Sequence, residues 1–169
     1  MQIEIAVREE RAADIGAIRE VNRDAFGQDQ EGRIVDALRA NGGALLSLVA
    51  TTNGRVAGHI MYSPISVGSV AGAALGPMAV EPQSQRLGMG TRLVEMGNRE
   101  LAARGCAFIV LVGHPQFYAR FGFRPAGAQG ITCEWELPDD VFMLLVLDEA
   151  KMRGVSGLAK FRDEFSSVS

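Results

Sequence analysis

The sequence predicts one α/β domain with a mixed sheet, and three patterns support this fold class. Stretches with helical spacing alternate with strand-like segments, an Asn-Gly turn joins two apolar segments, and a glycine-rich loop precedes a long amphipathic segment. The chain has 169 residues, of which 47% are apolar and 22% are charged. This length and composition are typical of a single globular domain, so we expect one domain over residues 1–169.

The first part of the chain predicts a strand and two helices. Residues 3–8 alternate apolar and polar side chains, as a half-buried strand does. The next helix either has Asp14 as its cap or begins one turn earlier, and it ends at Gly27. A second helix ends at residues 41–43. The apolar stripes that indicate these helices are Ile15, Ile18, Val21, Ala25 and Phe26 in the first helix, and Ile34, Val35 and Leu38 in the second.

The middle of the chain predicts an antiparallel meander. The expected strands are 44–52, 55–67 and 73–80, joined by a hairpin turn at Asn53-Gly54 and by a small-residue turn at 68–72. Pro77 lies inside the third strand, where it cannot donate a hydrogen bond to a neighbouring strand. We therefore expect this strand to bulge, or to separate from one neighbour, at Pro77.

The remaining segments predict a crossover followed by further strands. We expect a helix at 88–103, a strand at 106–112, one or two helical turns at 116–121, and two antiparallel strands at 131–137 and 141–147. Because a long helix joins strand 73–80 to strand 106–112, these elements should form a βαβ crossover. Residues 154–161 either add a strand or lie over a neighbouring subunit.

Charge and composition argue against several classes of protein. The net charge of −3 and the sequence pI of about 5.4 disfavour nucleic-acid binding, which requires a basic surface. The longest apolar runs have 7 residues, too few to span a bilayer, and the N-terminus lacks the pattern of a secretory signal. We expect a cytoplasmic protein without membrane partners or a metal site, in which Cys106 and Cys133 are small buried apolar residues.

The most informative segment is the loop and helix start at residues 76–91. Gly88 and Gly90 lie where a helix begins, and the first N–H groups of a helix have no partners within it. Together with the helix dipole, the Arg86 charge and the Thr91 hydroxyl, these N–H groups can form a cradle for phosphate. A tight turn that binds nothing would use the same two glycines. The third glycine of a dinucleotide-binding motif is missing, and no Gly-Lys-Ser/Thr phosphate loop is present.

The arrangement Gln85-x-x-Gly88-x-Gly90 resembles the Q/R-x-x-G-x-G/A pyrophosphate loop of the GCN5-related N-acetyltransferase (GNAT) family. A second segment, GHPQFYARFGF at 113–123, is similar to the aromatic segment after the fifth strand of these enzymes, above all in a small bacterial subgroup. The resemblance covers residues 3–148, which we take as the core, with 149–169 as an extension. It implies a GNAT-like fold with a mostly antiparallel sheet, flanking helices and a splayed strand pair.

The resemblance also implies acetyl-CoA as cosubstrate and a site that binds it. The strand with Met78, Ala79 and Val80 would separate from strand 106–112 and pair with the pantetheine arm; the alternative for Pro77 is a structural bulge alone. The pyrophosphate would be held by the backbone amides of Leu87, Gly88, Met89, Gly90 and Thr91 and by the side chains of Gln85 and Arg86. Phe117 and Phe121 would pack in the core or form a wall against the pantetheine.

Tyr118 matches the family tyrosine near the CoA sulfur, which makes it the predicted catalytic residue. Free tyrosine has a pKa of about 10 and a thiol about 8.5, so proton transfer to the thiolate is uphill by roughly 2 kcal/mol. A hydrogen bond that strengthens as thiolate charge develops is therefore the expected role. The alternative is a core aromatic residue with a hydrated hydroxyl.

The implied reaction is acetyl transfer to a primary amine, on a small molecule or a peptide, by direct attack in a ternary complex. Relatives often place a glutamate on the strand equivalent to 73–80 to deprotonate the amine, but this strand has no carboxylate, so the base is unassigned. We expect Glu81 to be a solvated loop charge and His114 to be a local cap or a ligand contact. His59 either faces the acceptor as a base or is a partly buried residue without a catalytic role.

The sequence offers candidates for the acceptor side and two rival functions. The helices within 11–40 should line the acceptor side, with Asp24, Phe26 and Glu31 as candidate contacts. The missing glutamate allows a second hypothesis, a CoA-binding sensor or regulatory module without turnover. A third reading is a structural interaction domain whose glycines only form turns. Members of the resembled family commonly dimerise, so a homodimer is a further expectation.

Overall fold

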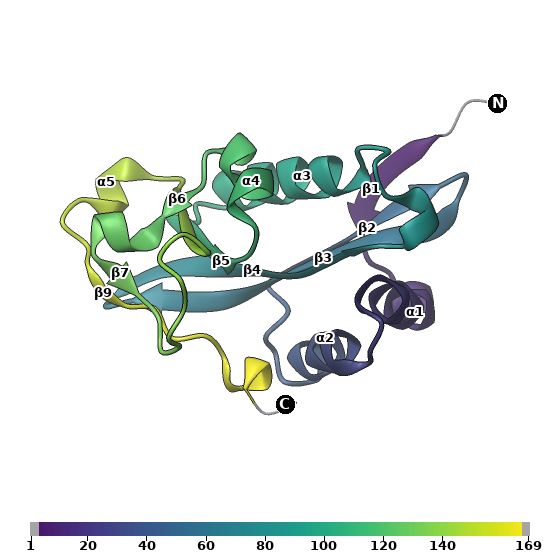
Figure 1. The fold of residues 1–169 in the computed structure, drawn as a ribbon, viewed down its shortest axis with the longest axis horizontal. Coiled ribbons are helices and arrows are strands. Elements are labelled where there is room, and N and C mark those ends of the chain that lie inside the picture. The colour runs from purple at the N-terminus through teal and green to yellow at the C-terminus, as the bar shows by residue number, and fades with distance from the viewer. Residues whose placement is uncertain (1–3, 167–169) are drawn as a thin grey trace.

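The computed structural model describes residues 4–166, and its centre is a seven-stranded sheet with helices on both faces (Figure 1). The elements in chain order are β1 (Ile5–Glu9), α1 (Ile15–Phe26), α2 (Gln30–Ala40), β2 (Leu46–Thr52), β3 (Arg55–Val67), β4 (Val70–Val80), α3 (Met89–Ala103), β5 (Phe108–Val112), α4 (Pro115–Tyr118), β6 (Arg124–Pro125), β7 (Ile131–Thr132), β8 (Phe142–Val146), α5 (Glu149–Met152) and β9 (Gly157–Leu158). The strand order is β1-β2-β3-β4-β5-β8-β6, and β4–β5 is its parallel pair. The predicted α/β class, mixed sheet and βαβ crossover are confirmed.

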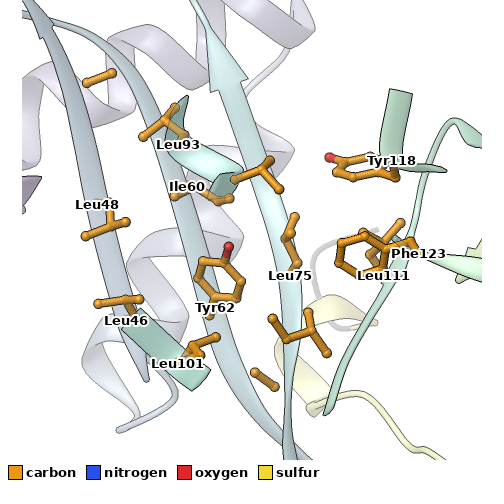
Figure 2. Close-up of a cluster of buried hydrophobic side chains, with 14 of the residues drawn as sticks. Leu46, Leu48, Ile60, Tyr62, Leu75, Leu93, Leu101, Leu111, Tyr118 and Phe123 are labelled. Carbon is orange, nitrogen blue, oxygen red and sulfur yellow. The ribbon is translucent and has the colours of Figure 1, made fainter. Parts of the chain in front are cut away.

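Alternating side chains of the strands supply a core on each face of the sheet. Leu48, Ile60 and Tyr62 point toward α3 and pack in one buried cluster with it (Figure 2). Val49 and Met61, one position along the same strands, pack against α1 and α2 on the opposite face. Within residues 4–166, no helix combines the length and apolar character that crossing a membrane requires.

The two N-terminal helices lie where the sequence predicts them, with a correction at the start of α1. Asp14 occupies the capping position, but its side chain forms no hydrogen bond to the first turn of α1. Its carboxylate instead accepts hydrogen bonds from the Arg8 guanidinium at 2.7 and 3.0 Å and from the Arg11 amide at 2.7 Å. Asp14 therefore ties the helix entrance to β1. The predicted start of that strand at Ile3 lies outside the described residues.

The meander is confirmed, but its third strand begins earlier than predicted. Gly68 and Ser69 suffice for the turn, and β4 pairs with β3 from Val70 onward. Gly72, expected in the turn, lies in the strand directly over the Phe108 ring: a Cβ atom there would lie 2.5 Å from Phe108 Cζ. The small residues at 68–72 thus reflect close packing over an aromatic ring as well as a turn.

The parallel pair β4–β5 is short, because the two strands soon diverge. They pair at Ala73 with Ile109 and at Ala74 with Val110, and no pairing continues toward their C-terminal ends. On the other side of β4, its register with β3 shifts between Ile60 and Tyr62, next to the stretch of β4 that contains Pro77. The predicted bulge and strand separation are therefore both present. The strands that carry Leu75 and Leu111 diverge visibly in Figure 2.

The predicted antiparallel pair 131–137 and 141–147 is wrong in its first member. β8 forms, but it pairs with β5 and β6, while β7 is two residues long and pairs in parallel with β9 of the C-terminal segment. Cys133, Trp135 and Leu137 pack half-buried against the core, and the polar residues between them are exposed. A loop that lies along an apolar surface thus has the same alternation as a strand. Both cysteines of the chain are free and only half-buried.

Candidate functional site

Two cavities meet where β4 and β5 diverge. The first, here called the loop cavity, has a volume of about 600 Å³ and is bounded by the 85–91 loop, the end of β4 and α4. The second, here called the aromatic cavity, has a volume of about 540 Å³ and lies among α1, α2, the ends of β4 and β5, and the C-terminal segment. Phe26, Met78 and Phe117 line both cavities, so the two are adjoining compartments of one site.

An ion pair between a buried carboxylate and an exposed arginine fixes the loop that borders the loop cavity. Glu81 is only 4% exposed, and its carboxylate accepts two hydrogen bonds of 2.7 Å from the Arg55 guanidinium and one of 2.6 Å from Ser84 Oγ. The guanidinium of Arg55 keeps the pKa of Glu81 below its usual value. The expectation of a solvated loop charge was therefore wrong. Glu81 fastens the turn after β4 to β3, and Gln85 Nε2 adds a bond of 3.0 Å to the Val80 carbonyl.

The start of α3 supplies free amides to the loop cavity. Gly88 adopts a left-handed conformation (φ 82°) immediately before the helix, which favours glycine. The first hydrogen bond of the helical ladder runs from the Arg92 amide to the Gly88 carbonyl, at 3.1 Å. The preceding amides, those of Met89, Gly90 and Thr91, are left for another acceptor, and these residues line the cavity. The geometry is that of an anion site.

Two arginines line the loop cavity beside these amides. Arg86 has a left-handed backbone conformation (φ 70°), which is uncommon for a residue with a side chain. Arg120, not singled out from the sequence, lies with its guanidinium carbon 4.5 Å from the centre of the Phe117 ring, and Nη2 donates to Thr91 Oγ1 at 3.3 Å. Arg120 follows Phe117 by three residues on one helical turn, and this spacing predicts that the two side chains lie side by side.

The separated end of β4 offers backbone groups to the same cavity. The Glu81 amide donates to the carbonyl of Ala57 in β3 at 2.9 Å, so the backbone N–H of Glu81 faces β3. Because successive residues of a strand direct their backbone groups to opposite sides, Ala79 also faces β3, while Met78 and Val80 face the gap. All three residues line the loop cavity.

Tyr118 lies at the edge of the gap and lines the aromatic cavity. Its ring packs edge-on against Phe117 at 4.9 Å and against Phe123 at 5.9 Å, and it is 9% exposed. Gly113 makes room for it, since a Cβ atom there would lie 2.7 Å from Tyr118 Cε2. In Figure 2 the hydroxyl points toward β4. Burial raises the pKa of Tyr118 to about 12, so the hydroxyl is a proton donor at neutral pH.

Two other predicted contacts lie outside both cavities. Phe121 packs against Phe117 at a ring distance of 5.3 Å, and it faces a separate surface hollow together with Leu145. The Leu87 side chain is 43% exposed and lines neither cavity, although its backbone belongs to the loop. Of the aromatic residues after β5, Phe117 is therefore the one that borders both compartments.

His59 is a buried structural residue. It is fully buried on the face of the sheet that packs against α1 and α2, and it borders neither cavity. Its Nε2 lies 2.8 Å from Ser47 Oγ, and Ser47 donates its own proton to Glu10 at 2.5 Å. Nε2 must therefore carry the ring proton. Burial lowers the pKa of His59 to about 4, and the alternative in which this residue faces an acceptor is wrong.

The aromatic cavity contains two side chains that can accept a proton. Glu31 borders it from α2, and Gln28 Nε2 donates to both carboxylate oxygens at 3.1 Å. His114 borders it from the N-terminal end of α4, and its carbonyl accepts hydrogen bonds from the first amides of that turn. Asp24, a third candidate from the sequence, does not line it. Within residues 4–166, no group of three or more His, Cys, Asp or Glu side chains is placed to hold a metal ion.

Comparisons with known proteins agree with this geometry. Residues 44–125 match the family model of the acetyltransferase (GNAT) domain. The chain is 31% identical to the uncharacterized N-acetyltransferase YhbS of Escherichia coli over 163 residues, which cover 95% of this chain and 98% of YhbS. The crystal structure of YhbS in complex with CoA superposes with a TM-score of 0.94 at 30% identity, over 100% of this chain and 96% of that one. A GNAT family acetyltransferase from Brucella melitensis in complex with acetyl-CoA gives a TM-score of 0.79 at 33% identity, over 96% and 98% of the two chains.

Proposed function

This chain belongs to the GNAT family and is an N-acetyltransferase that uses acetyl-CoA, and from this premise we propose how its two cavities divide the reaction. The loop cavity binds the pyrophosphate and pantetheine of acetyl-CoA. The aromatic cavity binds the acceptor amine. The observation that carries the proposal is that the two cavities share Phe26, Met78 and Phe117, and that Tyr118, whose ring packs against Phe117, lines the aromatic cavity.

The pyrophosphate site combines backbone amides with two cations. The amides of Met89, Gly90 and Thr91 point out of the start of α3, where the helix dipole favours a negative charge. Arg86 and Arg120 add full positive charges on the same cavity wall. Each hydrogen bond to a charged oxygen contributes on the order of 1.5–3 kcal/mol, so a few such bonds are enough to anchor the nucleotide end of the cosubstrate.

The pantetheine arm lies along the gap between β4 and β5. Met78 and Val80 direct their peptide groups into this gap, so an extended amide chain can pair with them as an added strand would. The Gln85 side chain, which now bonds to the Val80 carbonyl, would compete for that acceptor and has to turn away for pairing there. This arrangement brings the thioester to the junction of the two cavities.

Tyr118 stabilises the leaving thiolate. The amine nitrogen attacks the carbonyl carbon of the thioester, a C–N bond forms, and the C–S bond breaks as negative charge develops on sulfur. The pKa of Tyr118 is about 12. Relative to a thiol pKa of about 8.5, full proton transfer to sulfur would be uphill by about 5 kcal/mol. A hydrogen bond that strengthens as the thiolate forms avoids this cost. The nitrogen that has attacked releases its extra proton to solvent as the amide forms, and the sulfur takes up a proton from solvent later.

The acceptor reaches the enzyme as an ammonium ion and must lose a proton before it attacks. For an alkylamine with a pKa of about 10.4, this deprotonation costs about 4–5 kcal/mol at pH 7. Glu31 and His114 are the side chains in the aromatic cavity that can receive the proton, directly or through water. Neither lies on β4, which has no carboxylate of its own.

Calorimetry with a matched pair of variants tests the loop cavity. Gly88→Asp introduces a residue that tolerates both the left-handed conformation and the capping position. It also adds a negative charge where the pyrophosphate would bind. Gly154→Asp makes the same change at another left-handed glycine, outside both cavities. We expect Gly88→Asp to abolish acetyl-CoA binding and Gly154→Asp to retain it. Equal affinity in the two variants would contradict the proposed site.

Turnover distinguishes the enzyme from a CoA-binding module. We expect CoA release from acetyl-CoA when an acceptor amine is added, and loss of that release in Tyr118→Phe while acetyl-CoA still binds. Tight cosubstrate binding without CoA release across a broad range of amines would instead support a sensor that lacks turnover.

A further inference from the structure

The lining of the aromatic cavity combines many aromatic rings with few charged groups. Among the described lining residues, one carboxylate is present, that of Glu31, and there is no arginine or lysine. His114 is the other side chain there that can accept a proton. Six aromatic rings account for much of the remaining wall; they belong to Phe26, Phe117, Tyr118, Trp135, Phe161 and Phe165.

The far wall of this cavity is well supported. The Trp135 ring stacks on Phe161 with centroids 4.7 Å apart, and Phe161 meets Phe165 edge-on at 5.6 Å. These rings come from the loop before β8 and from the C-terminal segment, two segments far apart in sequence. The Phe161 amide also donates to the Glu134 carboxylate at 3.3 Å, which fixes the backbone beneath the rings.

An ion-pair network fastens the C-terminal segment to the end of α2. The Glu164 carboxylate is buried and accepts hydrogen bonds from the Arg162 guanidinium at 2.9 and 3.0 Å and from Asn41 Nδ2 at 3.2 Å. Arg162 Nη2 also donates to the Asn41 carbonyl at 3.2 Å. The segment that carries Phe161 and Phe165 is therefore held in place by two residues that lie between the rings, Arg162 and Glu164.

From this lining, and resting on the proposed function of the site, we propose that the acceptor is a small monoamine with an aromatic group and no carboxylate, such as an arylalkylamine. Glu31 attracts the ammonium group, and the aromatic wall receives the ring. A polyamine or an aminoglycoside would bring further cations without carboxylates to meet them. An amino acid would bring a carboxylate with no cation opposite. In both cases an unpaired charge enters a largely apolar cavity, which is unfavourable.

A matched panel of amines tests the substrate class directly. Release of CoA from acetyl-CoA is measured with phenethylamine, with phenylalanine, which adds only a carboxylate, with spermidine, which replaces the ring by further amines, and with a short peptide. We expect kcat/KM for phenethylamine to exceed that for each of the others by about tenfold or more. A better rate with spermidine, phenylalanine or the peptide would overturn the inference while leaving acetyl transfer intact. No release with phenethylamine would also overturn it.

Binding without chemistry separates this inference from the proposed function. In the presence of CoA, which cannot donate an acetyl group, we expect phenethylamine to bind in calorimetry and phenylalanine to bind at least about tenfold more weakly. Failure of acetyl-CoA itself to bind would refute the proposed function, whereas CoA binding with no selectivity between the two amines would refute only the acceptor class.

A variant of Glu31 tests whether its carboxylate attracts the ammonium group of the acceptor. Glu31→Gln keeps the size of the side chain and removes its charge, so we expect KM for phenethylamine to rise about tenfold while KM for acetyl-CoA stays unchanged. Glu20→Gln makes the same change on the exposed surface of α1, outside both cavities, and should alter neither constant. An unchanged KM for phenethylamine in Glu31→Gln would contradict the assignment.

Discussion

The two tyrosines of the chain belong to one buried cluster, yet their hydroxyl groups are in opposite situations. Tyr62 lies in the middle of β3, and its hydroxyl donates to Asn98 Oδ1 on α3 at 3.0 Å. Tyr118 lies at the edge of the strand gap, and among residues 4–166 its hydroxyl makes no hydrogen bond. Burial raises the pKa of both residues, that of Tyr118 to about 12. Burial therefore does not distinguish a functional tyrosine here. The open hydroxyl beside a cavity does.

The largest effect should come from removing the open hydroxyl. We expect Tyr118→Phe to lower kcat by about 100-fold or more, because the developing thiolate loses a preorganised donor. The unfolding free energy should hardly change, since no protein partner is left unpaired. Steady-state kinetics and thermal unfolding measure the two effects. A fall in stability that matches the fall in activity would make Tyr118 a packing residue like Tyr62.

A second change tests how tightly the other tyrosine is enclosed. A Cβ atom at Gly97 would lie 2.2 Å from Tyr62 Oη, so we expect Gly97→Ala to destabilise the fold by about 3 kcal/mol through overpacking. Gly16→Ala is the matched control in α1, where a Cβ atom meets nothing within 4 Å and helix propensity should raise stability slightly. Chemical denaturation of the two variants compares them. Equal stability would show that the Tyr62 ring has room to move.

The two histidines repeat the contrast between enclosed and open side chains, and pH tests it. Burial lowers the pKa of His59 to about 4, whereas a histidine in the unfolded chain has a pKa of about 6.5. The native state therefore binds fewer protons, so stability is full above pH 6.5 and falls by about 2 kcal/mol between pH 6.5 and 4.5. His59→Gln should flatten this slope. His114→Gln, which removes the exposed ring, is the matched control.

The smallest effect should come from the hydrogen-bonded hydroxyl of the enclosed tyrosine. Tyr62→Phe leaves Asn98 without its donor, but Asn98 is half-exposed and water can replace the bond. We expect a loss of about 1 kcal/mol in unfolding free energy and no change in kcat. A loss of activity comparable to that of Tyr118→Phe would mean that the two hydroxyls act together, and the comparison above would fail.

Much of the fold and part of the site follow from local sequence patterns. The Asn53-Gly54 hairpin, the helix that begins after Gly88 and the disruption at Pro77 each depend on the conformational limits of a few neighbouring residues. These local features place the loop cavity and the strand gap. The motif that contains Tyr118 likewise lies in one short segment of the chain.

The errors concern residues whose environment is set by distant partners. The local sequence indicates that Glu81 is a surface charge, because its partner Arg55 comes into contact with it only when β3 and β4 pair. Residues 131–137 alternate like a strand, but the neighbouring positions in the sheet are taken by β5 and β6. The far wall of the aromatic cavity depends on Phe161 stacking on Trp135 and on Phe165 packing against Phe161, and no local pattern specifies the contact with Trp135.

The Arg162–Glu164–Asn41 network has a consequence for how this enzyme can diversify. The segment it secures adds no strand to the seven-stranded sheet, yet it carries two of the rings that would meet the acceptor. Selection can then alter which amine is acetylated by changing a few residues around 161–165, while the residues that bind the acetyl donor stay the same. Grafting this stretch between homologues is thus a route to new acceptor preferences on an unchanged scaffold.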